Sequence, residues 1–434
     1  MAIGAVLVLV LAGTAAWRLS RDRHSCGDAV TSLSAKRSTS PFLDASGRRQ
    51  QPDADRDRAV TSLGAAPAPF GPVVGAVGYH YEQWAQISAY DQGIGIRTRD
   101  NPDFTMLDDQ TLRPRWSVQV GTKRSTYDAD GDTYLVATMP RAGAPDLVAL
   151  DASTGARRWC ASLGGPHVGA DDPLSTLLLG DGGMVVLGPG KGHLERMVRL
   201  DRHGRQRWSR ELDADEGDFL GLVGGSLLVL GGRPDFQLQD ARGLGDRLSS
   251  VRMLSLATGH SVWEVGVVKG AGEHVVGLDN GITVVHQRNV VTGSDRLVGL
   301  DEEGSEVWQV VLPPGRAADA AVRAGRVLLR QGSLWTALDA ATGRALWSRR
   351  VPTSPQLLPY GFQLEDVSLL DDDRALLGTT TGLRVLDLRT GAFTATAPLP
   401  TDGISTTYWP YAVAVSPRLI AVATNTSAVV LRRR

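Results

Sequence analysis

The chain has 434 residues, and its 42% hydrophobic content supplies enough apolar side chains for a large packed core, which excludes wholesale disorder. Its 46 Lys and Arg residues balance 47 Asp and Glu residues, so a net charge of -1 gives no reason to expect nucleic acid as a partner. Two cysteines are too few for a disulfide framework. Lysine is rare beside arginine, a bias typical of a GC-rich genome such as that of an actinobacterium.

Residues 1–17 carry no charged side chain and contain the aliphatic run Ala5–Ala12. A helix of this length spans roughly 25 Å, close to the roughly 30 Å hydrocarbon layer of a membrane. We predict a transmembrane signal anchor or a signal peptide, and a buried helix or strand is the alternative. Arg18, Arg21 and Arg23 follow the run, and the positive-inside rule alone would place the rest of the chain in the cytoplasm.

A start site assigned too far downstream would remove the basic residues that normally precede such a segment. We therefore expect a single pass through the cytoplasmic membrane with the rest of the chain outside, or a secreted protein if the segment is cleaved. Residues 18–75 are rich in Arg, Asp, Ser, Ala and Pro without hydrophobic periodicity, which predicts a flexible extracytoplasmic linker. Outside the cell, Cys26 in this linker and Cys160 could form a disulfide, and two unpaired thiols are the alternative.

From residue 76 to residue 434, short apolar runs alternate with turn residues and one phrase recurs. It consists of a Leu-Asp pair, a polar turn ending in Gly, and a Trp four residues later. Its positions are Asp151, Gly155, Trp159; Asp201, Gly204, Trp208; Gly259, Trp263; Asp301, Gly304, Trp308; Asp339, Gly343, Trp347; and Asp387, Gly391 without Trp. A further copy, Asp108 to Trp116, has Leu112 in place of Gly. A period of about 40 to 50 residues predicts a β-propeller or a solenoid.

The composition of the phrase has a structural explanation. Residues 147–150 are apolar on both faces of a strand, which indicates burial between two sheets. Asp151 can accept hydrogen bonds from the turn, and Gly155 fits the left-handed position that closes it. Trp159 then falls on the outer strand and can lie over the adjacent blade, where burial contributes at most about 4–6 kcal/mol. The tryptophans are therefore interpreted as scaffold residues and not as a ligand cage.

The pattern from Asp151 through Gly155 to Trp159 resembles the tryptophan-docking motif of PQQ-like β-propellers, a superfamily that includes quinoprotein alcohol dehydrogenases and BamB-like proteins. The fold is therefore expected to be all-β, a propeller of seven four-stranded blades over residues 76–434. In that arrangement residues 115–120 complete a last sheet formed by three C-terminal strands. The alternative is eight blades, with one built partly from residues 76–107.

The resemblance implies that an enzyme of this superfamily would carry adjacent cysteines and calcium ligands, whereas Cys26 and Cys160 are far apart. No catalytic, cofactor-binding or metal site is predicted. We expect a non-catalytic, membrane-tethered binding or scaffold module of the cell envelope whose partners are envelope or membrane proteins. The alternatives are an extracellular small-ligand sensor and a quinoprotein dehydrogenase-like enzyme. Three longer inter-repeat segments, 163–173, 233–249 and 352–366, are the expected binding loops.

Overall fold

The structure is a computed structural model that describes residues 68–78, 85–90, 93–98, 104–118, 127–130, 133–137, 147–161, 175–179, 181–189, 194–213, 219–223, 227–231, 251–265, 271–289, 294–313, 319–350, 367–379, 382–398, 412–423 and 427–434. Within these ranges all regular elements are β-strands. None of these residues belongs to a helix with the length and apolar character that a membrane crossing requires. The predicted anchor, 1–17, lies outside the described residues.

The described strands form eight four-stranded antiparallel sheets, each of which we call a blade. Seven blades are consecutive in the chain: β2–β5 (Ala85–Tyr90, Gly93–Thr98, Phe104–Leu107, Pro114–Val118), β6–β9 (Tyr127–Asp130, Thr133–Ala137, Leu147–Asp151, Arg157–Ala161), β10–β13 (Ser175–Leu178, Met184–Pro189, Leu194–Leu200, Gln206–Asp213), β14–β17 (Phe219–Val223, Leu227–Gly231, Val251–Ser255, Ser261–Val265), β18–β21 (Ala271–Asp279, Ile282–Asn289, Ser294–Leu300, Glu306–Leu312), β22–β25 (Asp319–Arg323, Arg326–Gln331, Leu334–Asp339, Ala345–Arg350) and β26–β29 (Ser368–Asp371, Arg374–Thr379, Gly382–Asp387, Phe393–Pro398). The remaining blade joins β1 (Phe70–Gly78) to β30 (Ala412–Val415), β31 (Leu419–Ala423) and β32 (Ser427–Arg433).

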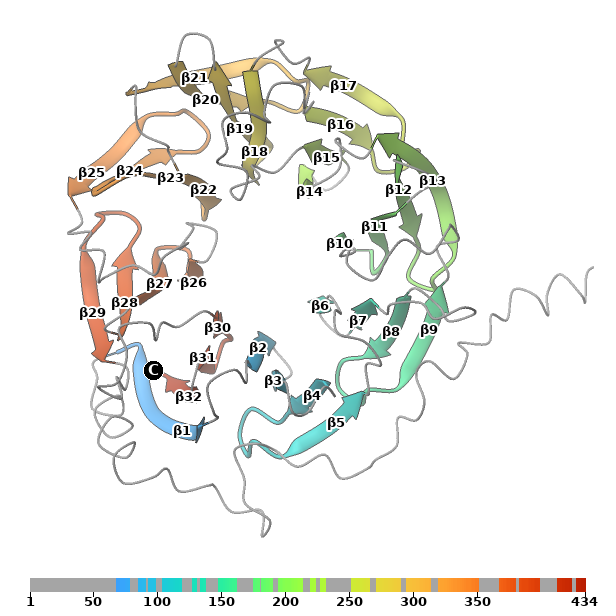
Figure 1. Ribbon diagram of the computed structural model, residues 1–434, viewed down its shortest axis with the longest axis vertical. Coiled ribbons are helices and arrows are strands. Elements are labelled where there is room, and N and C mark those ends of the chain that lie inside the picture. Colours follow the sequence, from blue (N-terminus) through green and yellow to red (C-terminus); the bar gives the residue numbers. More distant parts are fainter. Residues whose placement is uncertain are drawn as a thin grey trace, which may run out of the picture.

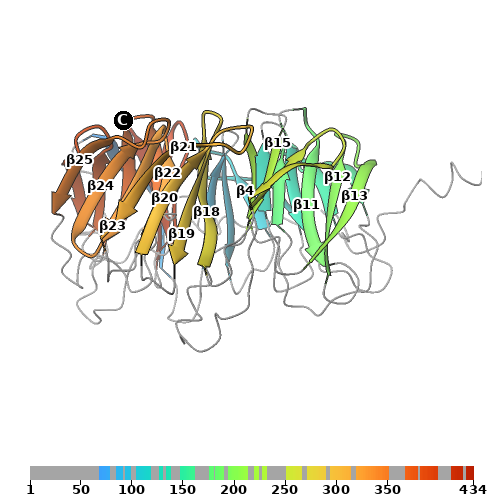
Figure 2. The same ribbon diagram turned by 90° about the horizontal axis from the view of Figure 1, so that it is seen from above.

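The blades stand side by side in a closed ring (Figure 1), and the side view shows their strands running between the two faces of that ring (Figure 2). The prediction of a β-propeller is therefore confirmed. The count of seven blades is wrong, and the alternative of eight blades, one built partly from residues 76–107, matches the sheets. Residues 114–118 form β5, the outer strand of its own blade with β2–β4, and do not complete the C-terminal sheet.

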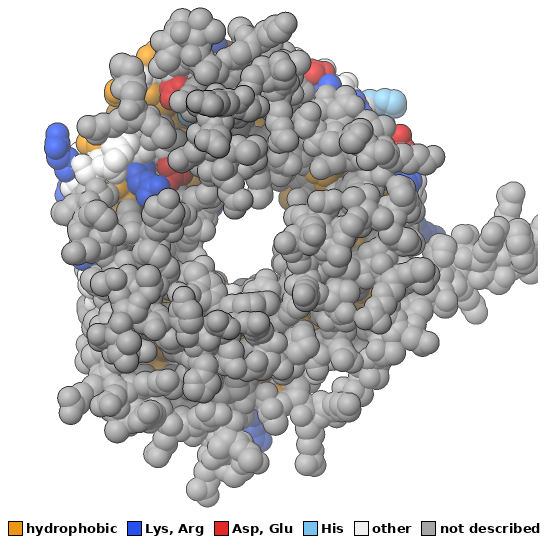
Figure 3. All heavy atoms as spheres, in the orientation of Figure 1, with side chains coloured by type: hydrophobic (Ala, Val, Ile, Leu, Met, Phe, Trp, Pro, Cys, Tyr) orange, Lys and Arg blue, Asp and Glu red, His pale blue; other side chains and the backbone are white. Residues whose placement is uncertain are grey.

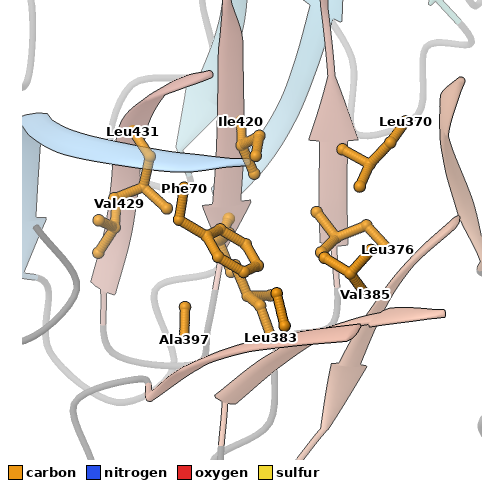
Figure 4. Close-up of a cluster of buried hydrophobic side chains, with 11 residues drawn as sticks. Phe70, Leu370, Leu376, Leu383, Val385, Ala397, Ile420, Val429 and Leu431 are labelled. Atoms are coloured by element: carbon orange, nitrogen blue, oxygen red, sulfur yellow. The ribbon is translucent and has the colours of Figure 1, made fainter. Parts of the chain in front are cut away.

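β1 closes the ring by pairing antiparallel with β32, from Phe70 opposite Arg433 to Gly78 opposite Ser427. It begins at Phe70, before the expected boundary at residue 76. The boundary was misplaced because β1 carries none of the motif residues that mark the other outer strands. Phe70 is fully buried and belongs to a cluster with Leu383 and Ala397 of the preceding blade and Leu431 of its own (Figure 4). The strand that completes the last sheet is therefore β1, and not residues 115–120 as expected.

The hydrophobic core lies between the blades. The buried residues form eight clusters, and each cluster joins two consecutive blades of the ring. On β8, Val148 and Leu150 pack with the blade β2–β5, whereas Leu147 and Ala149 pack with the blade β10–β13. Alternate side chains of one strand therefore fill two different seams, as the apolar character of both faces predicts.

Candidate functional site

The motif tryptophans lie at the seams between blades, each against the turn glycine of the next blade. A Cβ atom added at Gly343 would lie 2.7 Å from Cδ2 of Trp308, and one added at Gly391 would lie 2.6 Å from Cε3 of Trp347. The same relationship joins Gly155 to Trp116, Gly204 to Trp159, Gly259 to Trp208, and Gly304 to Trp263. All six glycines have φ between 67° and 80°, a left-handed conformation that favours glycine.

A hydrogen bond fixes the orientation of the indole ring at most of these seams. Nε1 of Trp308 donates to the carbonyl oxygen of Ala340 at 3.0 Å, and Nε1 of Trp347 donates to that of Leu388 at 2.8 Å. Corresponding bonds run from Trp116 to Ala152, from Trp208 to Leu256, and from Trp263 to Glu302. The buried indole thus satisfies its donor with a carbonyl of the next blade and links consecutive blades.

The motif aspartates organise the turns that receive these tryptophans. Oδ1 of Asp151 accepts hydrogen bonds from the backbone N–H and hydroxyl groups of Ser153 and Thr154. Oδ2 accepts one from Arg158 at 2.8 Å. The Ser153 hydroxyl and the Arg158 guanidinium hold the pKa of Asp151 well below its usual value. Asp201, Asp301, Asp339 and Asp387 accept turn N–H groups in the same way.

Leu112 is an exception among the turn positions. It has a left-handed φ of 57°, as the glycines do, yet its side chain is fully buried in the cluster between β1/β30–β32 and β2–β5. The outer strand of the preceding blade is β1, which contains no Trp. No indole covers this turn, so a leucine side chain fills the space.

The structure thus distributes the predicted motif residues around the ring and brings none of them into a single catalytic constellation. Cys160 on β9 is disulfide-bonded, and its predicted partner Cys26 lies outside the described residues, so that pairing stays a prediction. The three expected binding loops, 163–173, 233–249 and 352–366, also lie outside them. Over the described part of the chain, no group of three or more His, Cys, Asp or Glu residues is arranged to hold a metal ion.

The residue before each docked Trp is a feature that the sequence interpretation missed. On β5, β9 and β13 it is arginine, and each arginine pairs with the aspartate of its own turn: Arg115 with Asp108 at 2.7 Å, Arg158 with Asp151 at 2.8 Å, and Arg207 with Asp201 at 3.0 Å. On the next three outer strands the equivalent residues are Val262, Val307 and Leu346, with 53%, 48% and 38% of their surface exposed. The signal was present in the sequence, one position before each Trp.

Comparison with known proteins agrees with this architecture. A family model described as outer membrane protein assembly factor BamB matches residues 84–234 and 247–433. The crystal structure of BamB from Moraxella catarrhalis is similar with a TM-score of 0.51 at 15% identity, covering 83% of this chain and 99% of that one. Quinohemoprotein alcohol dehydrogenase from Comamonas testosteroni is similar with a TM-score of 0.51 at 13% identity, covering 94% and 84%.

At these identities the two structures are evidence for the fold alone. A sequence search of curated proteins finds no match. The family match spans most of the ring, from β2 to β32, and the motif residues within it form the seams described above. The chain therefore belongs to the family of PQQ-like β-propellers whose model is described as outer membrane protein assembly factor BamB.

Proposed function

We propose that this protein is a non-catalytic binding or scaffold module of the cell envelope, tethered to the membrane by residues 1–17. The observation that carries the proposal is the family match to BamB over two spans that together cover most of the ring. The described motif residues have a structural role, because the indoles, turn glycines and turn aspartates hold consecutive blades together. The expected partners are envelope or membrane proteins, bound through the faces or the rim of the ring.

We further propose that the ring lies on the outer side of the cytoplasmic membrane, or is secreted if the N-terminal segment is cleaved. The disulfide at Cys160 supports this location, since disulfides form and persist in oxidising compartments. The arginines that follow the apolar segment argue for the opposite orientation under the positive-inside rule. Location is therefore the first property to test.

Protease added to intact cells that produce the full chain with a C-terminal tag gives a direct answer. The proposal expects loss of the tag without lysis, while a cytoplasmic control protein survives. Protection of the tag in intact cells, with cleavage after lysis, would place the ring in the cytoplasm and overturn the envelope role. Cross-linking in the same cells, followed by capture of the tagged chain, should recover the same envelope proteins in repeated preparations. Recovery of cytoplasmic proteins alone would count against the proposal.

The quinoprotein dehydrogenase remains the second candidate because one similar structure is such an enzyme. This candidate predicts a result that the scaffold proposal does not. Purified full chain supplied with pyrroloquinoline quinone and calcium would show a quinone absorption band and oxidise alcohols with an artificial electron acceptor. The scaffold proposal expects neither signal under conditions in which a known dehydrogenase of this type shows both. Thermal stabilisation by a small molecule without turnover would instead favour the sensor.

A further inference from the structure

Exposed arginines are concentrated in one short stretch of the outer hairpins of three consecutive blades. The stretch is the three residues before the docked Trp, and it reads Arg-Pro-Arg before Trp116, Ala-Arg-Arg before Trp159 and Arg-Gln-Arg before Trp208. In the next three blades the same stretch contains a single arginine, Arg344. We call the six exposed side chains the basic edge: Arg113, Arg115, Arg157, Arg158, Arg205 and Arg207.

Each of these three hairpins uses one of its two arginines within its own turn. Nη2 of Arg115 lies 2.7 Å from Oδ2 of Asp108, and the hairpins of β9 and β13 contain the equivalent ion pair. These pairs neutralise the turn aspartates. The second arginine of each hairpin, Arg113, Arg157 or Arg205, forms no ion pair within the described residues. Each hairpin therefore presents one positive charge in excess.

The three excess charges are held on neighbouring, mutually packed hairpins. Trp116 docks on the turn of Gly155 and Trp159 docks on the turn of Gly204, so the hairpins contact one another in sequence. Because every blade is a meander, these turns lie on one face of the ring, the upper face in Figure 2. Figure 3 shows Lys or Arg side chains at the outer edge of the ring on the side where Figure 1 places β9 and β13. A flat surface that meets this edge can contact all three hairpins.

The next part of the rim carries the opposite charge. The hairpin of β21 exposes Glu302, Glu303 and Glu306, and β17 exposes Glu264. An extended anionic surface is therefore attracted to the basic edge and repelled by the adjacent blades. This asymmetry favours one orientation of the ring on such a surface.

We propose that the basic edge binds the phosphate headgroups of an anionic lipid membrane and thereby fixes the orientation of the ring. The guanidinium group matches phosphate oxygens in geometry and remains charged throughout the physiological pH range. Three arginines at an anionic lipid surface favour the bound orientation by on the order of a hundredfold. The inference rests on the proposed membrane tether and applies to either side of the membrane.

The position of Cys160 favours a lipid surface over a soluble polyanion as the partner. Cys160 is disulfide-bonded and lies on β9, the middle hairpin of the basic edge. The predicted pairing with Cys26 would leave only residues 18–26 between the anchor and β9, and these span about 30 Å at full extension. The tether would then hold the basic edge, and not the acidic hairpin of β21, beside the membrane.

Energy transfer from the full chain to a dye on the lipid headgroups tests this orientation. Donor probes are placed at Ala156 and Ala345, exposed positions in the hairpins of β9 and β25 on opposite sides of the ring (Figure 1). In vesicles of phosphatidylcholine with phosphatidylglycerol, transfer should be greater from position 156, and the difference should shrink as salt is added. Equal transfer from both positions would overturn the basic edge. Absence of transfer from either position would instead overturn the proposed tether.

A matched pair of variants separates these arginines from a general effect of charge. Arg113→Gln/Arg157→Gln/Arg205→Gln removes the three excess charges and retains the turn ion pairs, with the thermal midpoint as the control for folding. It should abolish the increase in the difference between the probes that phosphatidylglycerol produces. The control Arg344→Gln/Arg349→Gln/Arg350→Gln removes three exposed charges from the hairpin of β25 and should leave that increase unchanged. Loss of the increase in both variants, or in neither, would contradict the proposal.

Nucleic acid is the other class of polyanion that the test must distinguish. Labelled duplex DNA added at physiological salt should not reduce the difference between the two probes on phosphatidylglycerol vesicles. DNA binding that requires Arg113, Arg157 and Arg205, together with equal transfer from both probes, would assign the basic edge to nucleic acid and overturn the membrane contact.

Discussion

Leu112 and Gly343 occupy equivalent turn positions, with φ of 57° and 67°, yet one side chain is buried and the other is absent because an indole fills its place. The identity of the preceding blade explains the difference. Trp308 reaches the turn of Gly343 from the neighbouring outer strand, whereas β1 offers no Trp to the turn of Leu112. The residue at each turn is therefore determined by the blade before it.

The first prediction concerns Gly343→Ala. The new methyl group would lie 2.7 Å from Trp308 in a backbone conformation that alanine disfavours, so stability should fall by about 2–4 kcal/mol. Gly325→Ala is the matched control, because its φ is 75° but its nearest neighbour, Asp279 Oδ2, is 3.5 Å away. That variant should lose only about 1 kcal/mol. Equal losses in chemical denaturation would show that indole docking does not dictate the glycine.

A second prediction reverses the usual preference for glycine in left-handed positions. Leu112→Gly relieves a strain of about 1–2 kcal/mol. It also removes a fully buried leucine side chain, which costs about 2–5 kcal/mol. The net result should be a loss of about 1–3 kcal/mol, although glycine occupies the equivalent position in six other blades. A stabilised Leu112→Gly variant in thermal or urea unfolding would refute this account of the turn.

The pKa of Asp151 leads to a third prediction. Hydrogen bonds from Ser153 and Arg158 lower it in the folded state, so the carboxylate stabilises the protein above its unfolded pKa of about 3.9, and this contribution is lost as the pH falls below that value. Asp151→Asn should reduce stability at neutral pH by about 1–3 kcal/mol. The difference from the unmodified chain should shrink as the pH is lowered from 5 towards 2, as measured by urea unfolding.

Asp279 is expected to show the opposite dependence of stability on pH. Burial raises its pKa, so its contribution favours folding while it is protonated and is lost as the pH rises through the folded pKa. Asp279→Asn should therefore be at least as stable as the unmodified chain at neutral pH, and this advantage should disappear in acid. An Asn variant that lost stability at neutral pH, as expected for position 151, would contradict the assignment of burial as the dominant cause.

Ring closure gives the last prediction. Phe70 is fully buried between β1 and the blade β26–β29, so Phe70→Ala should cost about 3–5 kcal/mol. The variant should also become sensitive to proteolysis near β1 and near β32, the two strands that pair where the ring closes. Phe70→Leu should be milder, because it retains much of the buried volume. Uniform loss of protection around the ring, measured by hydrogen exchange, would show that the closing seam is not a separate weak point.

Most of the fold could be predicted from the sequence because the blades repeat one residue pattern. Alternating apolar residues, a turn aspartate, a left-handed glycine and a docked Trp are local signals, and the structure places them as this logic requires. The two incomplete copies were harder to interpret. Ala395 stands on β29 where a Trp is expected, and Leu112 stands where a glycine is expected. They lie in the two seams on either side of the blade that β1 completes. The motif docks the Trp of one blade on the turn of the next. This arrangement is interrupted at the last blade, because its outer strand is β1, which comes from a distant part of the chain and has no Trp.

The number of blades was mispredicted for the same reason. β1 has glycine and valine residues without a motif Trp, so nothing local distinguishes it from the linker before it. Its pairing with β32 depends on residues at opposite ends of the chain. The change from arginine to an apolar residue before the docked Trp could have been found in the sequence, because it requires only that this one position be compared across the blades.

The pairing of Phe70 with Arg433 also governs the order in which the protein can be completed. During synthesis at about 5–20 residues per second, β1 must wait on the order of tens of seconds before β32 exists. Throughout that interval its backbone is an open template for any other nascent strand. A truncation that removes β32 would make the interval permanent and leave two unprotected edges. Completion of the ring therefore depends on β32, and a chain that lacks this strand should form aggregates.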